Sequence, residues 1–385
     1  MLTIFFLIIY TFFLTFTESS DFSDYKKYKQ SIVNFKIKEV SKNNLNYPWG
    51  MTFLDKYTLL ITEKNGRLVK FNIKSGVTKE IEHNIPHIKT NFGQGGLLDV
   101  YAHLDGYIYF TYSHDHKDKN SNGKYLKNSS TAVGRGILSN DKIKNFKTLL
   151  IAKPKLTTNK HWGSRLIIKN DDLFVSFGER DKGMIAQNPQ QHPGSIIRIK
   201  TDGTIPTDNP AFNGYEEWLP EIYQIGMRNP QGMAISPHDG KIYFSQHGPM
   251  GGDNLGLVKF GGNFGWKDIA WGGTEYSGKK IGKVPFKKIY DSHIMTWVPS
   301  LGIGNINFYK GEIFPEWDGD LLVSATKSKM LAVLKFENNQ IIDQRIIIKN
   351  NRNIGRIRDF EIDYKGNIYL ISDEKGSSIW KLYRD

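Results

Sequence analysis

The chain has 385 residues, a formal net charge of +13 and no cysteine. Apolar residues make up 39 % of it, which is enough to bury a large core and excludes a disordered chain. The lack of cysteine excludes a disulfide scaffold, a thiolate metal site, an iron–sulfur protein and cysteine catalysis. The positive charge is spread over lysine-rich stretches without a recognition helix or an RNA-binding motif, so we expect no nucleic-acid partner.

The first segment, residues 1–20, is an apolar run that ends at Ser19 and Ser20. The run from Leu2 to Phe16 is shorter than the ~20 residues that a membrane span requires. It predicts a secretory signal peptide, with an uncleaved N-terminal anchor as the alternative. We therefore expect a periplasmic or secreted protein, with residues 21–385 as its single folded domain and no stable membrane partner.

The remaining chain repeats a pair of short β-rich strands joined by a polar turn. The six first strands are expected at residues 49–54, 95–102, 163–169, 231–236, 304–309 and 357–363. The six second strands begin at Tyr57, Tyr107, Leu173, Ile242, Leu321 and Ile368. A third strand follows in most units, and no long amphipathic helix interrupts them. This pattern indicates an all-β protein.

Six such units predict a six-bladed β-propeller, in which four-stranded antiparallel blades surround a central channel. The stretch Ser31–Val40 precedes the first unit. We expect it to supply the outer strand of the last blade, because this closes the ring and removes a free sheet edge. A pair of β-sandwiches is the alternative.

The loop before each first strand is expected at the mouth of the channel, because that strand lines the channel in a propeller. Polar residues occupy this position in five units: Gln94, His161, Arg165, Arg228, Asn229, Ser300, Arg356 and Arg358. Their shared position predicts one binding site. His161 is its candidate general base, because imidazole titrates near neutral pH. The arginines suit an anionic ligand.

The segment Gln246–Asp253, QHGPMGGD, follows the second strand of the fourth unit. Its glycines and proline leave backbone carbonyls exposed in a tight loop, and carbonyl oxygens suit Ca²⁺. A plain turn is the alternative. His114 and His116 form a second, weaker candidate metal group in a polar loop, for which a structural role is the simpler interpretation.

Three motifs carry a family resemblance: GMRNPQGMA at Gly226–Ala234, HGPMGGDNLGLVKFGGNFGW at His247–Trp266, and HWGSRL at His161–Leu166. They resemble the soluble quinoprotein glucose dehydrogenases and their relatives, the aldose sugar and sorbosone dehydrogenases. The resemblance runs from about Tyr47 to the C-terminus. It implies a six-bladed propeller, pyrroloquinoline quinone (PQQ) and Ca²⁺ as cofactors, and periplasmic oxidation of aldoses to lactones.

The resemblance also implies roles for single residues. His161 matches the base that takes the proton of the anomeric hydroxyl as hydride passes to the quinone. Gln94 matches a residue near the sugar. Arg228 matches the group that stabilises negative charge on the quinone oxygens.

The cofactor-binding residues are implied in the same way. Asn229 matches a cofactor contact, and the carbonyls of Gly248 and Pro249 match Ca²⁺ ligands. The cations that hold the cofactor match Lys327, Arg356 and Arg358. Several fixed positive charges suit a tricarboxylate such as PQQ.

The chain departs from the family pattern at Lys160, where the glucose dehydrogenases carry an acidic partner of the histidine. We therefore do not expect a preference for glucose. The carboxylate of their second, structural Ca²⁺ site has no clear match, although Glu275 lies nearby in the sequence. Residues 179–181, Glu-Arg-Asp, follow the second strand of the third unit and are expected to help shape the sugar pocket.

Two other functions remain open at this point. A Ca²⁺-dependent hydrolase such as a lactonase typically needs carboxylates and amides around a deep metal, whereas this ring is rich in His and Arg. A non-catalytic binding propeller is compatible with the fold alone. The sequence specifies a small-molecule aldose only as a class, and it indicates neither the electron acceptor nor the oligomeric state.

Overall fold

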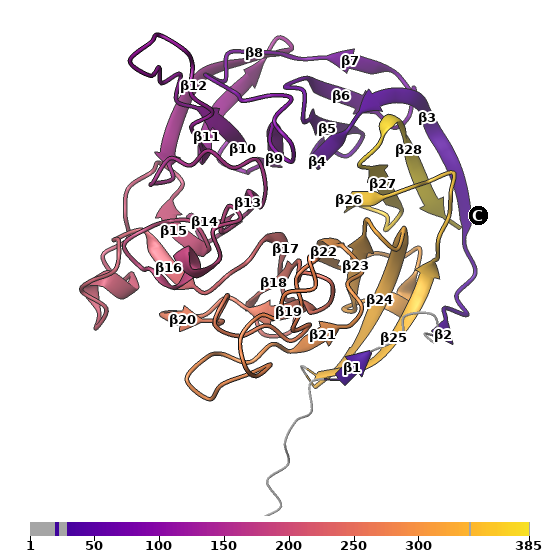
Figure 1. Cartoon of the computed structure of the whole chain (residues 1–385). Coiled ribbons are helices and arrows are strands. Elements are labelled where there is room, and N and C mark those ends of the chain that lie inside the picture. The colour runs from indigo at the N-terminus through magenta and orange to yellow at the C-terminus, as the bar shows by residue number, and fades with distance from the viewer. Residues whose placement is uncertain (1–19, 23–28, 339, 385) are drawn as a thin grey trace, which may run out of the picture.

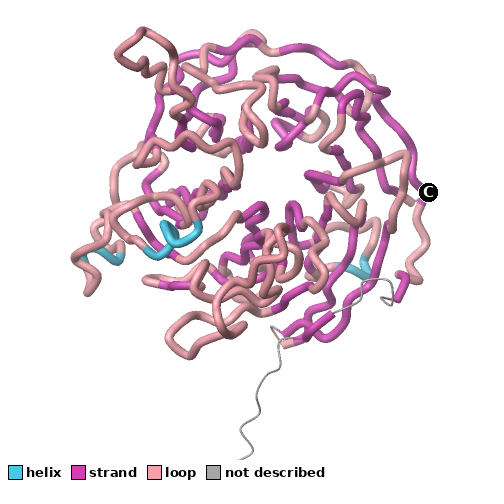
Figure 2. The backbone as a smooth tube through the Cα atoms, in the orientation of Figure 1, coloured by secondary structure: helices cyan, strands magenta, loops and turns pink. Residues whose placement is uncertain are grey.

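The computed structural model describes residues 20–22, 29–338 and 340–384. Six sheets stand in a ring around one axis and form a six-bladed β-propeller (Figure 1). Strands and connecting loops make up nearly all of the described residues, and the helices among them are short 3₁₀ turns at Gly183–Gln187, Pro210–Phe212 and Pro315–Trp317 (Figure 2). The predicted propeller is confirmed, and the alternative of paired β-sandwiches is wrong.

The first three blades follow one another along the chain. Blade 1 contains β4 (Pro48–Asp55), β5 (Thr58–Glu63), β6 (Leu68–Asn72) and β7 (Thr78–Glu80). Blade 2 contains β9 (Leu97–Ala102), β10 (Ile108–Asp115), β11 (Ser129–Ser139), β12 (Lys142–Ile151) and the short β8 (Glu82–His83). Blade 3 contains β13 (Gly163–Lys169), β14 (Asp172–Phe177), β15 (Ser195–Lys200), β16 (Ile222–Ile225) and the short β20 (Gly262–Asn263).

The last three blades also take strands from the N-terminal part of the chain. Blade 4 contains β17 (Pro230–Ile235), β18 (Ile242–Gln246), β19 (Asp253–Leu257), β21 (Met295–Trp297) and β1 (Ser20–Phe22). Blade 5 contains β22 (Ile303–Phe308), β23 (Leu321–Ala325), β24 (Met330–Glu337), β25 (Gln340–Ile348) and β2 (Lys29–Gln30). Blade 6 contains β26 (Ile357–Ile362), β27 (Ile368–Ser372), β28 (Lys375–Tyr383) and β3 (Lys36–Asn46).

Strand β3 closes the ring as expected, because it pairs antiparallel with β28 and is the outer strand of blade 6. It begins and ends later than the predicted Ser31–Val40, because its pairing with β28 continues to Asn46 opposite Lys375. The predicted signal peptide lies largely outside the described residues. Among the described residues, no helix is long and apolar enough to cross a membrane.

The apolar core lies between neighbouring blades. Strands such as β5 and β27 are buried over almost their whole length, because each blade packs a neighbour on both faces. Phe360 of β26 is fully buried in the cluster shared by blades 5, 6 and 1. Its replacement with alanine would cost about 3–5 kcal/mol.

The strand pairing defines one end of the channel, which we call the mouth. In blade 3 the start of β13 at Gly163 lies opposite the end of β14 at Phe177. In blade 4 the start of β17 at Pro230 lies opposite the end of β18 at Gln246. The residues before each first strand and those after each second strand therefore meet at the mouth.

Candidate functional site

His161 and Glu179 form the central pair of the site. Nδ1 of His161 lies 2.7 Å from Oε1 of Glu179. The other carboxylate oxygen of Glu179 accepts hydrogen bonds from the backbone N–H groups of Lys182 at 2.5 Å and Gly183 at 2.8 Å. Since an ionised carboxylate only accepts, Nδ1 carries the proton and Nε2 keeps its lone pair.

The environment keeps this imidazole neutral. Burial lowers the pKa of His161, and the hydrogen bond with Glu179 only partly opposes that effect. Burial would raise the pKa of Glu179, but its hydrogen bond with His161 brings that pKa below the ordinary value. The pair therefore presents a neutral base whose ring orientation is held by an ionised carboxylate.

The loop that carries His161 is held from three sides. The amide N–H of His161 donates to Oε1 of Gln94 at 2.8 Å, and that of Gly163 donates to Oδ1 of Asn229 at 3.0 Å. His161 itself has a positive φ of 50°. The loop also passes close to Gly178, where an added Cβ would lie only 2.1 Å from the carbonyl oxygen of His161. Glycine is therefore required at position 178.

Arg180 anchors the same loop from the outer side. Its guanidinium lies 3.4 Å from the ring centroid of Trp162 and donates to the carbonyl oxygens of Lys160, Thr158 and Ser129. Burial lowers its pKa to about 9. Lys160 forms an ion pair with Asp181 at 3.1 Å on the exposed rim. The glucose dehydrogenases carry the acidic partner of the histidine at the position of Lys160. In this chain Glu179 supplies that partner.

A group of cations surrounds Asp373 at the mouth of the channel. Nη2 of Arg358 and Nζ of Lys64 both lie 2.6 Å from Asp373 oxygens, and Arg356 lies 3.9 Å away. Burial would raise the pKa of Asp373, but Arg358 and Lys64 hold it far below the ordinary value. Three cations thus face one carboxylate. They line a cavity of about 140 Å³ together with Gln94, Asn229 and Trp49.

Arg228 and His247 contribute two polar atoms that are buried without a hydrogen-bond partner. Arg228 donates through Nη1 to the carbonyl of His247 at 3.2 Å, while its Nε has no partner among the described residues. Its guanidinium lies 5.2 Å from the ring centroid of Trp266. Nε2 of His247 is also unpaired, and burial lowers the pKa of His247 to about 4. Both groups are thus able to bind a ligand at the mouth.

The glycine-rich loop after β18 is shaped by Asp253. This carboxylate accepts hydrogen bonds from the N–H groups of Gly248 at 2.8 Å, Leu301 at 2.9 Å and Ile303 at 3.0 Å, and from the Ser300 hydroxyl at 2.6 Å. The Ser300 hydroxyl therefore supports the loop through Asp253. Gly248 and Pro249 are buried and lie beside Arg228, whereas Met250 of the same loop is exposed.

Two other predicted cations lie apart from this cavity. Arg165 points along the channel, where Nη1 lies 2.8 Å from Asp99 and 3.3 Å from Asp359 and Nε donates to the Gln231 carbonyl at 2.9 Å. It is a buried ion-pair residue. Lys327 is exposed, and its ammonium has no ion pair with another described residue. It does not line the cavity around Asp373.

The remaining metal candidates have other partners. Glu275 forms an ion pair with Lys267. His114 and His116 contact each other edge to face at 5.0 Å, and His116 bonds Ser130. Within the described ranges, the three side chains that come close enough to share a metal ion are His161, Glu179 and Asp181. The Glu179 carboxylate is already engaged by His161 and two backbone N–H groups.

Sequence reasoning missed Lys64, His247 and Asp373, and it did not connect Glu179 with His161. All four residues lie within two positions after a second strand, whereas the ring of polar residues was predicted from the loops before the first strands. Their repeated position was a usable signal. Lys64 follows LLITE in the first unit as Lys327 follows LLVSAT in the fifth.

Comparison with known proteins agrees with this architecture. The profile of the family "Glucose / Sorbosone dehydrogenase" matches residues 45–382. The chain is 32 % identical over 355 residues to the aldose sugar dehydrogenase YliI of Escherichia coli strain K12, covering 89 % of this chain and 92 % of that protein. It is 27 % identical over 421 residues to quinoprotein glucose dehydrogenase B of Acinetobacter calcoaceticus, covering 88 % and 86 %.

The solved structures agree with the sequence relatives. A crystal structure of the soluble aldose sugar dehydrogenase from Escherichia coli in its apo form superposes with a TM-score of 0.82 and 30 % identity, covering 91 % of this chain and all of that one. A glucose dehydrogenase structure gives 0.83 at 30 % identity with the same coverage. The resemblance drawn from the three motifs is confirmed. This chain belongs to the glucose/sorbosone dehydrogenase family of oxidoreductases.

Proposed function

We propose that the protein is a PQQ-dependent aldose dehydrogenase that oxidises the anomeric carbon of a sugar to a lactone. The observation that carries the proposal is the neutral His161, oriented by Glu179, beside a cavity with an excess of fixed positive charge. The name of the Acinetobacter relative, a quinoprotein, supports the choice of cofactor. The apolar N-terminal segment supports export to the periplasm or the medium.

The residues at the mouth fit a tricarboxylate such as PQQ. Lys64, Arg356 and Arg358 share one carboxylate, Asp373, which leaves an excess of two positive charges. The unpaired Nε of Arg228 and Nε2 of His247 supply further hydrogen-bonding groups. Charged hydrogen bonds of this kind contribute about 1.5–3 kcal/mol each. Asn229 would contact the cofactor, and Lys327 would reach it only through a change of its side-chain conformation.

The loop Gly248–Pro249 fits a Ca²⁺ ion. Neither carbonyl oxygen accepts a hydrogen bond from another described residue. The Asp253 carboxylate fixes the loop by accepting the backbone N–H of Gly248. Carbonyl oxygens are typical Ca²⁺ ligands. A cation here would lie next to Arg228, where it would polarise a carbonyl group of the cofactor.

His161 is positioned to act as the general base. The proton of the anomeric hydroxyl passes to Nε2 while the hydrogen on C1 leaves with its electron pair, and the C1–O bond becomes the carbonyl of the lactone. PQQ, when bound, supplies the acceptor for that hydride. Glu179 stabilises the imidazolium that forms. Gln94, whose Oε1 accepts the His161 backbone N–H, also lines the cavity around Asp373. The positive charge of Arg228 would stabilise the negative charge that develops on the quinone oxygens.

The test uses the purified protein with PQQ, Ca²⁺, a panel of aldoses and an artificial electron acceptor. We expect oxidation that requires both additions and that fails after EDTA treatment of the apoprotein. The absence of both oxidation and PQQ binding by calorimetry would refute the proposal. Hydrolysis of lactones under the same conditions would favour the hydrolase instead. The same panel identifies the sugar.

A further inference from the structure

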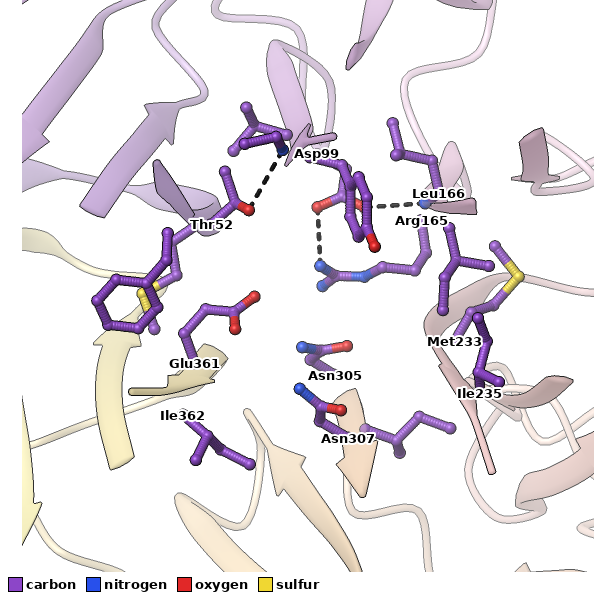
Figure 3. Close-up of a pocket in the computed structure, with 17 residues that line it drawn as sticks. Thr52, Asp99, Arg165, Leu166, Met233, Ile235, Asn305, Asn307, Glu361 and Ile362 are labelled. Carbon is purple, nitrogen blue, oxygen red and sulfur yellow. Dashed lines mark hydrogen bonds and ion pairs between the residues drawn. The ribbon is translucent and has the colours of Figure 1, made fainter. Parts of the chain in front are cut away.

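A second cavity, of about 380 Å³, lies at the end of the channel opposite the mouth. We call it the far cavity. The inner strands of all six blades line it with their later residues, such as Phe53, Ile167 and Ile362. Arg165 also lines it, with its guanidinium next to Asp99 (Figure 3). Asn305, Asn307 and Glu361, which also line the cavity, lie outside the three motifs that carry the family resemblance.

Side chains that carry oxygen atoms converge on the far cavity and make few hydrogen bonds to the protein. Asn305 and Asn307 lie side by side on β22, and their carboxamides and the carboxylate of Glu361 on β26 lie close together in the cavity (Figure 3). Asn305 is only 6 % exposed, yet its Oδ1 accepts no hydrogen bond from any described residue, and its Nδ2 makes one long contact of 3.5 Å. The carboxamide of Asn307 makes no hydrogen bond within the described chain. Buried polar side chains such as Asn305 normally have partners, whereas Asn307 and Glu361 are half-buried, and a ligand in the cavity would supply a partner to all three.

The charges around the far cavity do not balance. The carboxylates of Asp99, Asp359 and Glu361 face one cation, Arg165. The aspartates are engaged by Arg165 and by backbone N–H groups, so their oxygens are not free. Burial raises the pKa of Asp99 to about 7 and that of Glu361 well above its ordinary value. When all three are ionised, the net charge is −2, and a nearby cation would stabilise it.

We propose that the far cavity binds a divalent cation of the oxygen-liganded class that includes Ca²⁺, through the carboxylate of Glu361 and the amide oxygens of Asn305 and Asn307. Ca²⁺ takes six to eight oxygen ligands with flexible geometry, and the cavity has room for the waters that complete such a shell. No imidazole lines it, and the chain has no thiol, so Zn²⁺ and Cu²⁺ are disfavoured. Arg165 remains neutralised by Asp99 and Asp359.

This site is separate from the Ca²⁺ site suggested at the mouth. The mouth site uses backbone carbonyls of the Gly248–Pro249 loop, whereas the far cavity uses side chains of β22 and β26. The proposal therefore does not depend on the proposed activity. A variant of Glu361 alters the far cavity and leaves the mouth residues unchanged.

The first experiment locates the ion. Crystals of the EDTA-treated full chain are soaked in terbium(III) chloride, since terbium replaces Ca²⁺ on oxygen ligands and has a strong anomalous signal. We expect an anomalous peak between Glu361, Asn305 and Asn307. A peak at the Gly248–Pro249 loop together with an empty far cavity would overturn this proposal and leave the proposed function intact.

The second experiment counts the sites by calorimetric titration of the EDTA-treated protein with Ca²⁺. We expect Glu361→Gln to weaken Ca²⁺ binding at one site by about tenfold or more and to leave the PQQ-dependent activity unchanged. The matched control is Glu337→Gln, which removes the same charge from an exposed position of β24. Asn307→Leu is the second variant and is expected to weaken the same site. Unchanged Ca²⁺ stoichiometry and affinity in both variants would overturn the proposal.

Discussion

His161 and Glu179 flank the first hairpin of blade 3 on its two sides and meet at the channel mouth, with Nδ1 of the imidazole 2.7 Å from Oε1 of the carboxylate. The pairing of β13 with β14 brings together two residues that are 18 positions apart in the chain. The N–H groups of the following turn hold the second carboxylate oxygen, so the base has a fixed orientation before any substrate arrives.

Replacing the base itself is the most direct test of the mechanism. We expect His161→Ala to reduce kcat by about 10²–10⁴-fold, the usual contribution of a general base. PQQ affinity should change little, because the side chain is not one of the cations around Asp373. Steady-state kinetics and calorimetry on the same preparation measure the two quantities. A turnover within a few-fold of wild type would remove His161 from the mechanism.

Glu179→Gln tests the positioning carboxylate. The amide is uncharged, so we expect kcat to fall by at least about tenfold while KM changes little. The hydrogen bond from Glu179 raises the pKa of His161, so its loss lowers that pKa further, and the acid limb of the kcat–pH profile should move to lower pH. Glu217→Gln, at an exposed position, is the control. An unmoved limb would show that Glu179 has a structural role only.

Arg180 provides a second test of how His161 is positioned, in which kcat falls and the pH profile does not move. Arg180→Gln removes the stacking on Trp162 and the hydrogen bonds to the carbonyls of residues 158 and 160. We expect kcat to fall about tenfold through misplacement of His161. The acid limb should stay in place, because Arg180 is not among the charges that shift the pKa of His161. Arg180→Lys should recover part of the loss, and its failure to do so would indicate that stacking alone matters.

Variants of Arg356 and Lys327 test which of the predicted cations binds the cofactor. Arg356 lines the cavity, whereas Lys327 does not. Arg356→Gln is expected to weaken PQQ binding about tenfold, which corresponds to about 1.4 kcal/mol, and Lys327→Gln to weaken it less. Calorimetric titration of the two apoproteins with PQQ gives the comparison. A larger loss in the Lys327 variant would mean that the bound cofactor extends to the rim on the side of blade 5.

The raised pKa of Glu361 predicts that the folding stability depends on pH. Its pKa is raised in the folded state, so the group contributes stability below its unfolded pKa of about 4.3, and this contribution is lost as pH rises towards the folded pKa. Without added Ca²⁺, Glu361→Gln should therefore gain unfolding free energy over wild type as pH rises from about 5 to 8, by at most about 1.4 kcal/mol per pH unit. Urea unfolding at several pH values measures this difference. A constant difference across that range would contradict the raised pKa.

The repeat units alone determined the fold. Alternating runs of Ile, Val, Tyr and Phe with glycine-containing turns recur six times, and each run is a local property of the chain. The start of each first strand was therefore visible in the sequence, and with it Gln94, His161, Arg228 and Asn229. The family motifs pointed to the same residues.

The partners of these residues were decided only by the tertiary structure. The sequence placed Arg165 and Arg356 alike at the mouth. Arg165 instead lies within β13, buried against Asp99 and Asp359, whereas Arg356 precedes β26 and lines the cavity at the mouth. The direction of a side chain depends on the twist and packing of six blades, which no local pattern records. The same is true of Asn305, Asn307 and Glu361, because their meeting in the far cavity depends on how β22 packs beside β26 of the next blade.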